Sequence, residues 1–373
     1  MKKLIPVLYL LVPAVLVITS CEGPMGQTGK DANENCIQCH NQQVVDAKMI
    51  EYEHSKHFHG EAFEEGSRNS CAPCHSTQGF LYVTENKTPA NAYVTDATTA
   101  SLPGRLRCFT CHKNVHTTYT IDDFFPLTWT EPVQMVMWGG TKTLDFPKES
   151  SKLCAKCHQP RAVTGQSGVI NYASLVTSPD VPFTLAQINY RVGVHYGTEA
   201  AMNRGEGGIE FGTGYVKDHP HNQAAACATC HMAEPQGTTG GHSFVPGFNG
   251  CNVSGCHTNM SATNAGYTAL VTQFNTLLTT LGGQLNAIGA GHDILQRDPL
   301  DKQWHGYIDV YDVAANPTGF WGAPGNPPFP ALTNEQFGAL LNFQLLQRDG
   351  SSGIHNPKYM IQLLQNTITA LSQ

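Results

Sequence analysis

The chain has few charged residues, and most of them are acidic. Only 14% of its 373 residues are charged, and 22 Lys and Arg stand against 29 Asp and Glu, which gives a formal net charge of −7. Nucleic-acid binding requires a concentration of basic residues, so this composition predicts no nucleic-acid partner. Beyond residue 20 the sequence also has no apolar run long enough to cross a bilayer. We therefore expect most of the chain to form a soluble body.

Cysteine and histidine are abundant by contrast, with 13 Cys and 17 His. The pentapeptide C-x-x-C-H occurs five times, whereas random placement of these residues would give about 0.02 occurrences. A sixth copy has four residues between its cysteines. In chain order, the two cysteines and the histidine of each copy are Cys36, Cys39 and His40 in motif 1; Cys71, Cys74 and His75 in motif 2; Cys108, Cys111 and His112 in motif 3; Cys154, Cys157 and His158 in motif 4; Cys227, Cys230 and His231 in motif 5; and Cys251, Cys256 and His257 in motif 6.

Each C-x-x-C-H motif predicts one covalently attached haem c. The two thiols form thioethers with the haem vinyl groups, and the histidine becomes the first (proximal) axial ligand of the iron. Zinc sites and disulfide frameworks also use paired cysteines, but neither requires a histidine directly after every second cysteine. For motif 6 the alternative is a disulfide or two free thiols, and His257 in the corresponding place favours haem. The sequence therefore predicts six haem c groups.

An iron with a second axial ligand from the protein has no free position and serves electron transfer, whereas an iron without one can bind a substrate. Six of the 17 histidines belong to the motifs, and the remainder are more numerous than the six second ligands that the irons could take. We predict these distal ligands to be His57, His116, His195, His221, His242 and His355. The alternatives that the sequence leaves open are His54 or His59 for His57, His219 for His221, His292 and His305 in reserve, and the methionines Met135, Met137 and Met232.

The first 33 residues predict export and a lipid anchor. Lys2 and Lys3 precede the apolar run 4–18, as in a secretory signal, and the run ends shortly before Cys21, in the manner of a bacterial lipobox. We expect a signal peptide at 1–20, lipidation of Cys21, and a Gly-rich tether at 21–33. Glu22 in place of an aspartate favours the outer membrane. An ordinary cleaved signal or a membrane helix is the alternative.

The expected fold is mainly α, with extensive irregular loops wrapped around the haem chain. We place a haem-binding region at 34–260 and a C-terminal helical region at 261–373 that packs on it. An apolar helical face runs over 267–281 and can be interrupted by Gly282 and Gly283. Further on, 333–336 resembles a capping box and 356–357 an N-cap followed by a first-turn proline. The Thr- and Pro-rich segment 118–146 predicts surface loops with a few short strands.

Over residues 71–80, 194–197, 227–244 and 353–359, the chain resembles multihaem c-type cytochromes of metal-respiring bacteria. The resemblance includes the hexahaem cytochromes that polymerise into extracellular filaments and, more distantly, the cytochrome c554 group. What the resemblance implies is that His195, His242 and His355 are distal ligands.

Taken together, the sequence predicts a lipid-anchored hexahaem electron carrier, not an enzyme. Its partners would be redox proteins or an extracellular electron acceptor, and its location the outer membrane or the cell exterior. Two other readings stay open. One is a reductase of nitrite, hydroxylamine or a sulfur oxyanion, although the chain contains no C-x-x-C-K site of the kind found in ammonia-forming nitrite reductases. The other is a homo-oligomeric filament subunit, in which the histidines at 54–59 would bind a haem of the adjacent chain.

Overall fold

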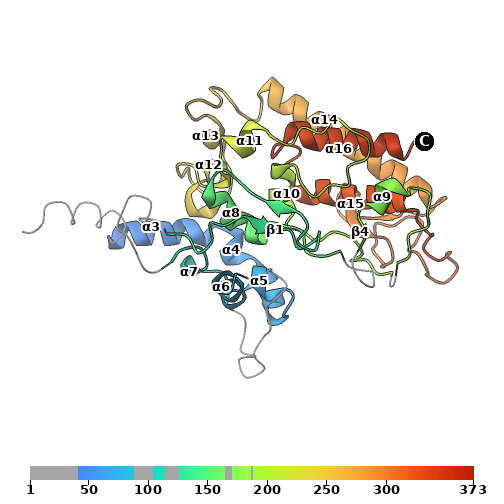
Figure 1. Cartoon of the computed structure of the whole chain (residues 1–373), viewed down its shortest axis with the longest axis horizontal. Coiled ribbons are helices and arrows are strands. Elements are labelled where there is room, and N and C mark those ends of the chain that lie inside the picture. Colours follow the sequence, from blue (N-terminus) through green and yellow to red (C-terminus); the bar gives the residue numbers. More distant parts are fainter. Residues whose placement is uncertain (1–40, 88–103, 114–125, 164–169, 186–187) are drawn as a thin grey trace, which may run out of the picture. The chain divides into compact units, whose positions relative to one another are not determined.

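The computed structural model describes residues 41–87, 104–113, 126–163, 170–185 and 188–373 (Figure 1). The chain divides into two compact units, Met1–Ile50 and Glu51–Gln373. Cys21, motif 1 and His116 lie outside the described residues, as do the predicted signal peptide and tether. All other predicted site residues belong to the second unit. Within the described ranges, no helix has both the length and the apolar character needed to cross a membrane.

The described chain is mainly helical with long irregular connections, as the sequence predicts. Two small antiparallel hairpins pair Val133 with Leu144 and Leu295 with Ile308. In chain order the elements are α3 (Gln42–Glu53), α4 (Lys56–His59), η1 (Glu61–Ser67), α5 (Ala72–His75), α6 (Thr77–Glu85), α7 (Cys108–Cys111), β1 (Val133–Gln134), β2 (Thr143–Leu144), α8 (Glu149–Cys157), α9 (Ser174–Thr177), α10 (Glu199–Arg204), α11 (Pro220–Gln223), α12 (Cys227–His231), η3 (Gly241–Ser243), α13 (Phe248–Cys251), α14 (Ala265–Ile288), β3 (Leu295–Arg297), β4 (Trp304–Ile308), α15 (Asn334–Asp349) and α16 (Pro357–Ala370).

Helix α15 is the centre of the protein core. Thirteen of its 16 residues are buried, because α14 and α16 pack along it and α9, α10 and β4 cover its other sides (Figure 1). The predicted capping box is confirmed at its start, where the Thr333 hydroxyl accepts a hydrogen bond from the Gln336 N–H and the Gln336 side chain accepts one from the Thr333 N–H. The predicted N-cap of α16 is confirmed too, since the Asn356 side chain accepts from the Tyr359 N–H.

The predicted interruption at Gly282 and Gly283 is wrong. Helix α14 continues through both glycines to Ile288. At Gly282 a Cβ atom would lie 2.5 Å from the indole ring of Trp304 and 3.1 Å from the ring of Phe343. Gly282 therefore allows β4 and α15 to approach α14 closely, and this packing outweighs the low helix propensity of glycine.

The sequence predicts that the segment 118–146 lies on the surface, and its described part also contributes several side chains to the core. The predicted short strands are present as β1 and β2. However, Val133, Met135, Met137, Leu144 and Phe146 are all at most 3% exposed and belong to the main hydrophobic cluster. Met135 and Met137 pack in this cluster, so their side chains are used for apolar packing.

Polar side chains on α15 fix the loops that carry candidate ligands. The Gln344 side chain accepts a hydrogen bond from the Val194 N–H at 2.7 Å and donates to the Val192 carbonyl at 2.9 Å. A Cβ atom at Gly193, which has φ +106°, would overlap with the Gln344 side chain. The Thr198 hydroxyl donates to the Leu345 carbonyl at 2.8 Å. Helix α15 therefore positions the chain on both sides of His195.

Candidate functional site

In motifs 2 to 5, the regular motifs that the structure describes, the C-x-x-C-H residues fold around one helical turn. The motif histidine donates its main-chain N–H to the carbonyl of the first cysteine, at 3.1 Å in motif 2 and at 2.9 Å in motifs 3 and 4. In motif 5 both cysteines and the histidine lie within α12. One turn of helix thus brings two thiols and an imidazole to one place, which attachment to a single rigid macrocycle requires.

Motif 6 forms the same hydrogen bond between its histidine and its first cysteine, although it has two additional residues between the cysteines. Helix α13 ends at Cys251, and the chain then turns through Gly255, which has φ +84°. The His257 N–H donates to the carbonyl of Cys251 at 3.2 Å. The wider spacing is therefore absorbed in the turn, and the histidine is returned to the first cysteine as in the regular motifs.

Every motif histidine that the structure describes faces a second histidine from a distant part of the chain. All five ring centroids lie 6.0–6.3 Å from those of their partners. The pairs are His75 with His195 at 6.2 Å, His112 with His242 at 6.3 Å, His158 with His57 at 6.0 Å, His231 with His355 at 6.2 Å, and His257 with His221 at 6.2 Å. The five partners are the predicted distal residues other than His116.

This separation fits two imidazoles on opposite sides of one iron. With metal–nitrogen bonds of about 2 Å, and ring centres about 1 Å further back, the centroids of two axial imidazoles are about 6 Å apart. Direct aromatic pairs also have centroid separations of about 4.5–7 Å, so the argument rests on the recurrence of one spacing at all five described motifs. The chemistry of the donor set, two thiols and two imidazoles at each of five places, therefore fits haem c.

Burial favours the neutral, metal-binding form of several of these imidazoles. Burial, and then the charge of His158, lowers the pKa of His57 to about 4. Burial also lowers the pKa of His195 to about 4, and it lowers the pKa values of His75 and His231. Only a neutral imidazole has a free lone pair for a metal.

In five of the paired histidines the ring nitrogen Nδ1 lies next to a hydrogen-bond acceptor, and these acceptors are of two kinds. In one group the ring Nδ1 faces a main-chain carbonyl, at 2.9 Å for His195 with Tyr196, 2.9 Å for His231 with Phe244 and 2.7 Å for His221 with Ile354. In the other group it faces a carboxylate. His158 Nδ1 lies 3.2 Å from Glu199 and His355 Nδ1 lies 2.6 Å from Asp349. Although burial opposes the charge, Asp349 raises the pKa of His355 to about 9.

The remaining candidate histidines occupy other surroundings. His219 is the N-cap of α11, where its ring accepts a hydrogen bond from the His221 N–H at 3.3 Å. His54 and His59 are exposed, and the ring of His59 packs on Phe58. His292 packs on Trp321, and His305 lies 3.0 Å from Asp298. Within the described ranges, no ring contact joins any of these five to a motif histidine.

The described motifs adjoin one another. The thiol of Cys74 in motif 2 contacts that of Cys157 in motif 4, and the thiol of Cys154 in motif 4 contacts that of Cys227 in motif 5. Motifs 5 and 6 meet where α12 packs on α13, and a Cβ atom at Gly250 would lie 2.9 Å from Cys230 Cα. Motif 4 therefore lies between motifs 2 and 5, and motif 5 lies between motifs 4 and 6.

Phe244 connects three of the histidine pairs. Its ring centroid lies 4.9 Å from that of His57 and 5.9 Å from that of His242, and its carbonyl faces His231. Motif 3 is therefore joined to motif 4 through a shared aromatic contact. Motif 4 thus has three neighbouring motifs.

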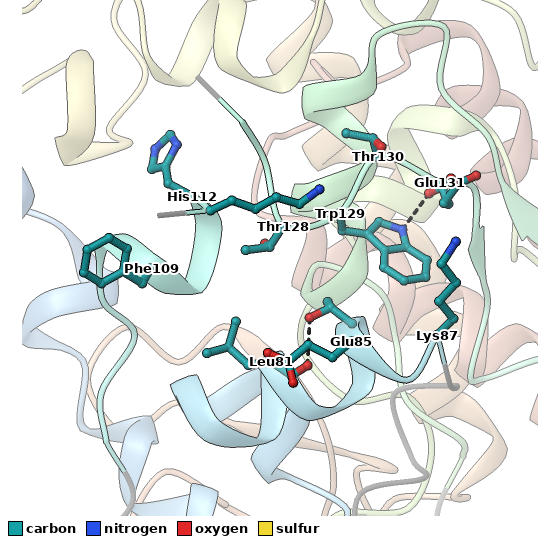
Figure 2. Close-up of a pocket in the computed structure, with 11 residues that line it drawn as sticks. Leu81, Glu85, Lys87, Phe109, His112, Thr128, Trp129, Thr130 and Glu131 are labelled. Carbon is teal, nitrogen blue, oxygen red and sulfur yellow. Dashed lines mark hydrogen bonds between the residues drawn. The ribbon is translucent and has the colours of Figure 1, made fainter. Parts of the chain in front are cut away.

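An open pocket lies beside the motif 3 histidine (Figure 2). Leu81 of α6, Phe109 of α7 and Trp129 give it apolar walls, while Lys87 and Lys113 bring ammonium groups to its lining. His112 is part of the same lining, and the Phe109 side chain is 60% exposed. Glu85 and Glu131 line the same pocket, so its two ammonium groups are balanced by two carboxylates, and its apolar walls fit an apolar group.

The sequence does not predict Glu199, Asp349 and Phe244 as parts of the site. Glu199 is 41 residues from His158 in the chain, so no local spacing links them. Asp349 is only six residues before His355, and a carboxylate at that short distance from a predicted ligand is the one signal that sequence reasoning could have used.

No family model matches the chain, and no curated protein matches its sequence. Among solved structures, the chain is similar to the crystal structure of the outer cell wall cytochrome OcwA, with a TM-score of 0.48 and 17% sequence identity. The similarity covers 87% of this chain and 50% of that protein, so the chain spans about half the length of the protein it matches. At this level of similarity, function has to be argued from the residues of the chain itself.

Proposed function

We propose that the protein is a hexahaem c-type cytochrome that transfers electrons through closely spaced, mostly bis-histidine haem sites. The observation that carries this proposal is the pairing of motif histidines, since each of the five described has a second imidazole at 6.0–6.3 Å. When bound, haem c supplies reversible one-electron transfer at its iron. An iron with two protein ligands has no open position for a substrate.

Different residues of the chain would attach the haems and bind their irons. The cysteines of motifs 2 to 6 would hold the haems covalently, and the paired histidines would bind the irons from both sides. For the remaining site we propose Cys36, Cys39 and His40 as attachment and proximal residues, with His116 as a distal ligand. At motif 3, Leu81 and Phe109 would cover the haem.

The adjoining motifs support electron transfer between sites. Motif 4 shares thiol contacts with motifs 2 and 5 and an aromatic contact with motif 3. Such proximity serves an electron carrier, because the protein contributes mainly position, burial and electrostatic surroundings to its cofactors.

We further propose that the protein is exported and anchored to the outer membrane through a lipid on Cys21. The support is the charged and apolar start of the sequence and its lipobox-like end. Its partners would be redox proteins or an extracellular electron acceptor. Assembly into a filament through His57 is not favoured, since that ring lies against His158 of its own chain.

Electron paramagnetic resonance of the oxidised holoprotein tests the proposed function. We expect six low-spin ferric signals and no high-spin signal. A His195→Ala variant serves as the control, because opening one iron should convert one site to a high-spin form. A high-spin haem in the wild-type protein that binds nitrite or hydroxylamine would overturn the carrier and favour a reductase.

A further inference from the structure

The two kinds of acceptor at the outer histidine nitrogens divide the sites into two electrostatic classes. At motif 2 both histidines bond to main-chain groups, His195 Nδ1 to the Tyr196 carbonyl at 2.9 Å and His75 to Ala62. The charge of Glu65 also acts on His75, but through space and without a hydrogen bond to the ring. At motifs 4 and 5 one histidine of each pair instead faces a carboxylate. A hydrogen bond to an ionised acceptor is about twice as strong as one to a neutral acceptor.

We propose that Glu199 lowers the reduction potential of the motif 4 site, and Asp349 that of the motif 5 site, below the potential of the motif 2 site. This inference rests on the proposed function. A carboxylate that accepts the outer N–H of an imidazole makes the ring a stronger donor to its metal. A stronger donor and a nearby negative charge both favour the ferric over the ferrous state, and hydrogen bonding around the iron is one of the levers that set its potential.

Asp349 is held in place independently of His355. It is the last residue of α15, and only 4% of its surface is exposed. Its Oδ1 accepts hydrogen bonds from the N–H and the hydroxyl of Ser351, which leaves Oδ2 directed at His355 Nδ1 at 2.6 Å. Burial reduces screening by water, so this charge acts strongly on the neighbouring imidazole.

Glu199 is positioned by the same central helix. It is the first residue of α10, and the preceding Thr198 is tied to the Leu345 carbonyl of α15 at 2.8 Å. Its Oε2 lies 3.2 Å from His158 Nδ1. The positions of both carboxylates are therefore fixed by α15, a helix that contributes no candidate iron ligand.

Glu51 near His242 belongs to neither class. Its Oε2 accepts the main-chain N–H of His242 at 2.9 Å, and the same oxygen is 3.4 Å from the ring Nδ1. This carboxylate is engaged mainly with the backbone, so the inference is confined to motifs 2, 4 and 5. At equilibrium a partly reduced protein would hold its electrons at motif 2 in preference to motifs 4 and 5.

Spectroelectrochemical titration of the full holoprotein tests this inference with the variants Glu199→Gln and Asp349→Asn. Both changes keep an oxygen that can accept the histidine N–H and remove only the charge. Each variant should raise the potential of one of the six haems, and the double variant should raise two. Electron paramagnetic resonance should show a changed g-value at the same single haem, because the donor strength of one axial imidazole has changed.

Two controls separate this effect from general damage. Asp298→Asn removes a carboxylate that lies 3.0 Å from His305, a histidine outside the ring pairs, and should leave all six potentials unchanged. Asp349→Glu keeps the charge and should keep the low potential. The inference is overturned if neither charge-removing variant moves a potential, or if all six move together. A high-spin haem in the wild-type spectrum would instead overturn the proposed function. The two failures are distinguishable, because the spin state is read from the wild-type protein and the shifts in potential from the variants.

Discussion

The Gln344 side chain binds the main chain next to His195, accepting the Val194 N–H at 2.7 Å and donating to the Val192 carbonyl at 2.9 Å. It also donates to the carbonyl of Gly306 in β4. A single buried amide in α15 thus joins the loop of a candidate iron ligand to the β3–β4 hairpin.

Replacing this amide with an apolar group should be costly. Gln344→Leu leaves three buried main-chain groups without their partners, and we expect it to lower the free energy of unfolding by about 3 kcal/mol. Urea denaturation followed by far-ultraviolet circular dichroism would measure the change. Gln365→Leu, at an exposed position on α16, is the control and should stay within about 0.5 kcal/mol. Equal effects of the two changes would contradict the positioning role of Gln344.

His221 and His219 should respond differently to removal. The ring of His221 faces His257, whereas His219 caps α11. We expect His221→Ala to produce one high-spin haem in the oxidised spectrum. His219→Ala should keep every haem low-spin and cost about 1 kcal/mol of stability through the lost cap. The opposite pattern of spin states would reverse the assignment.

The two adjacent glycines of α14 offer a matched test of packing against helix propensity. A Cβ atom at Gly282 would lie 2.5 Å from the Trp304 ring, whereas one at Gly283 would lie 3.7 Å from it, an ordinary contact distance. Gly282→Ala should therefore destabilise the protein by about 1–3 kcal/mol through overpacking. Gly283→Ala should stabilise it by about 0.5–1 kcal/mol, because alanine is the better helix former. Thermal denaturation of both variants gives the comparison, and a stabilising Gly282→Ala would refute the packing argument.

A buried carboxylate should make stability depend on pH. Asp309 is fully buried, and burial together with the charge of Asp293 raises its pKa from 3.8 to about 7. Between these two values the folded protein binds a proton that the unfolded chain releases, so stability falls as pH rises through that window. The slope contributed by this one group is at most about 1.4 kcal/mol per pH unit. Urea denaturation at pH 5 and pH 8 should show a larger loss for the wild type than for Asp309→Asn, and an equal loss would refute the prediction.

The candidate ligand residues can be proposed from the sequence because their chemistry is local, whereas their pairing cannot. Two cysteines and a histidine on one helical turn are visible as a spacing in the sequence. The contact of His75 with His195 depends instead on a loop fixed by α15, which no spacing reveals. The choice between His219 and His221 follows from the proline that starts α11, since this turn uses the His219 ring as its cap. At Gly282, a tertiary contact with Trp304 overrode a local propensity.

The hydrogen bond that returns His257 to Cys251 in motif 6 affects how such motifs should be counted in other sequences. A search that fixes two residues between the cysteines finds five candidate sites in this chain and overlooks the candidate at 251–257. The hydrogen bond from the His257 N–H to the Cys251 carbonyl indicates that the constraint is the return of the histidine to the first cysteine, and that loop length is free to vary where a glycine permits the turn. Genomic surveys that rely on the pentapeptide alone would therefore overlook candidate sites of this wider kind.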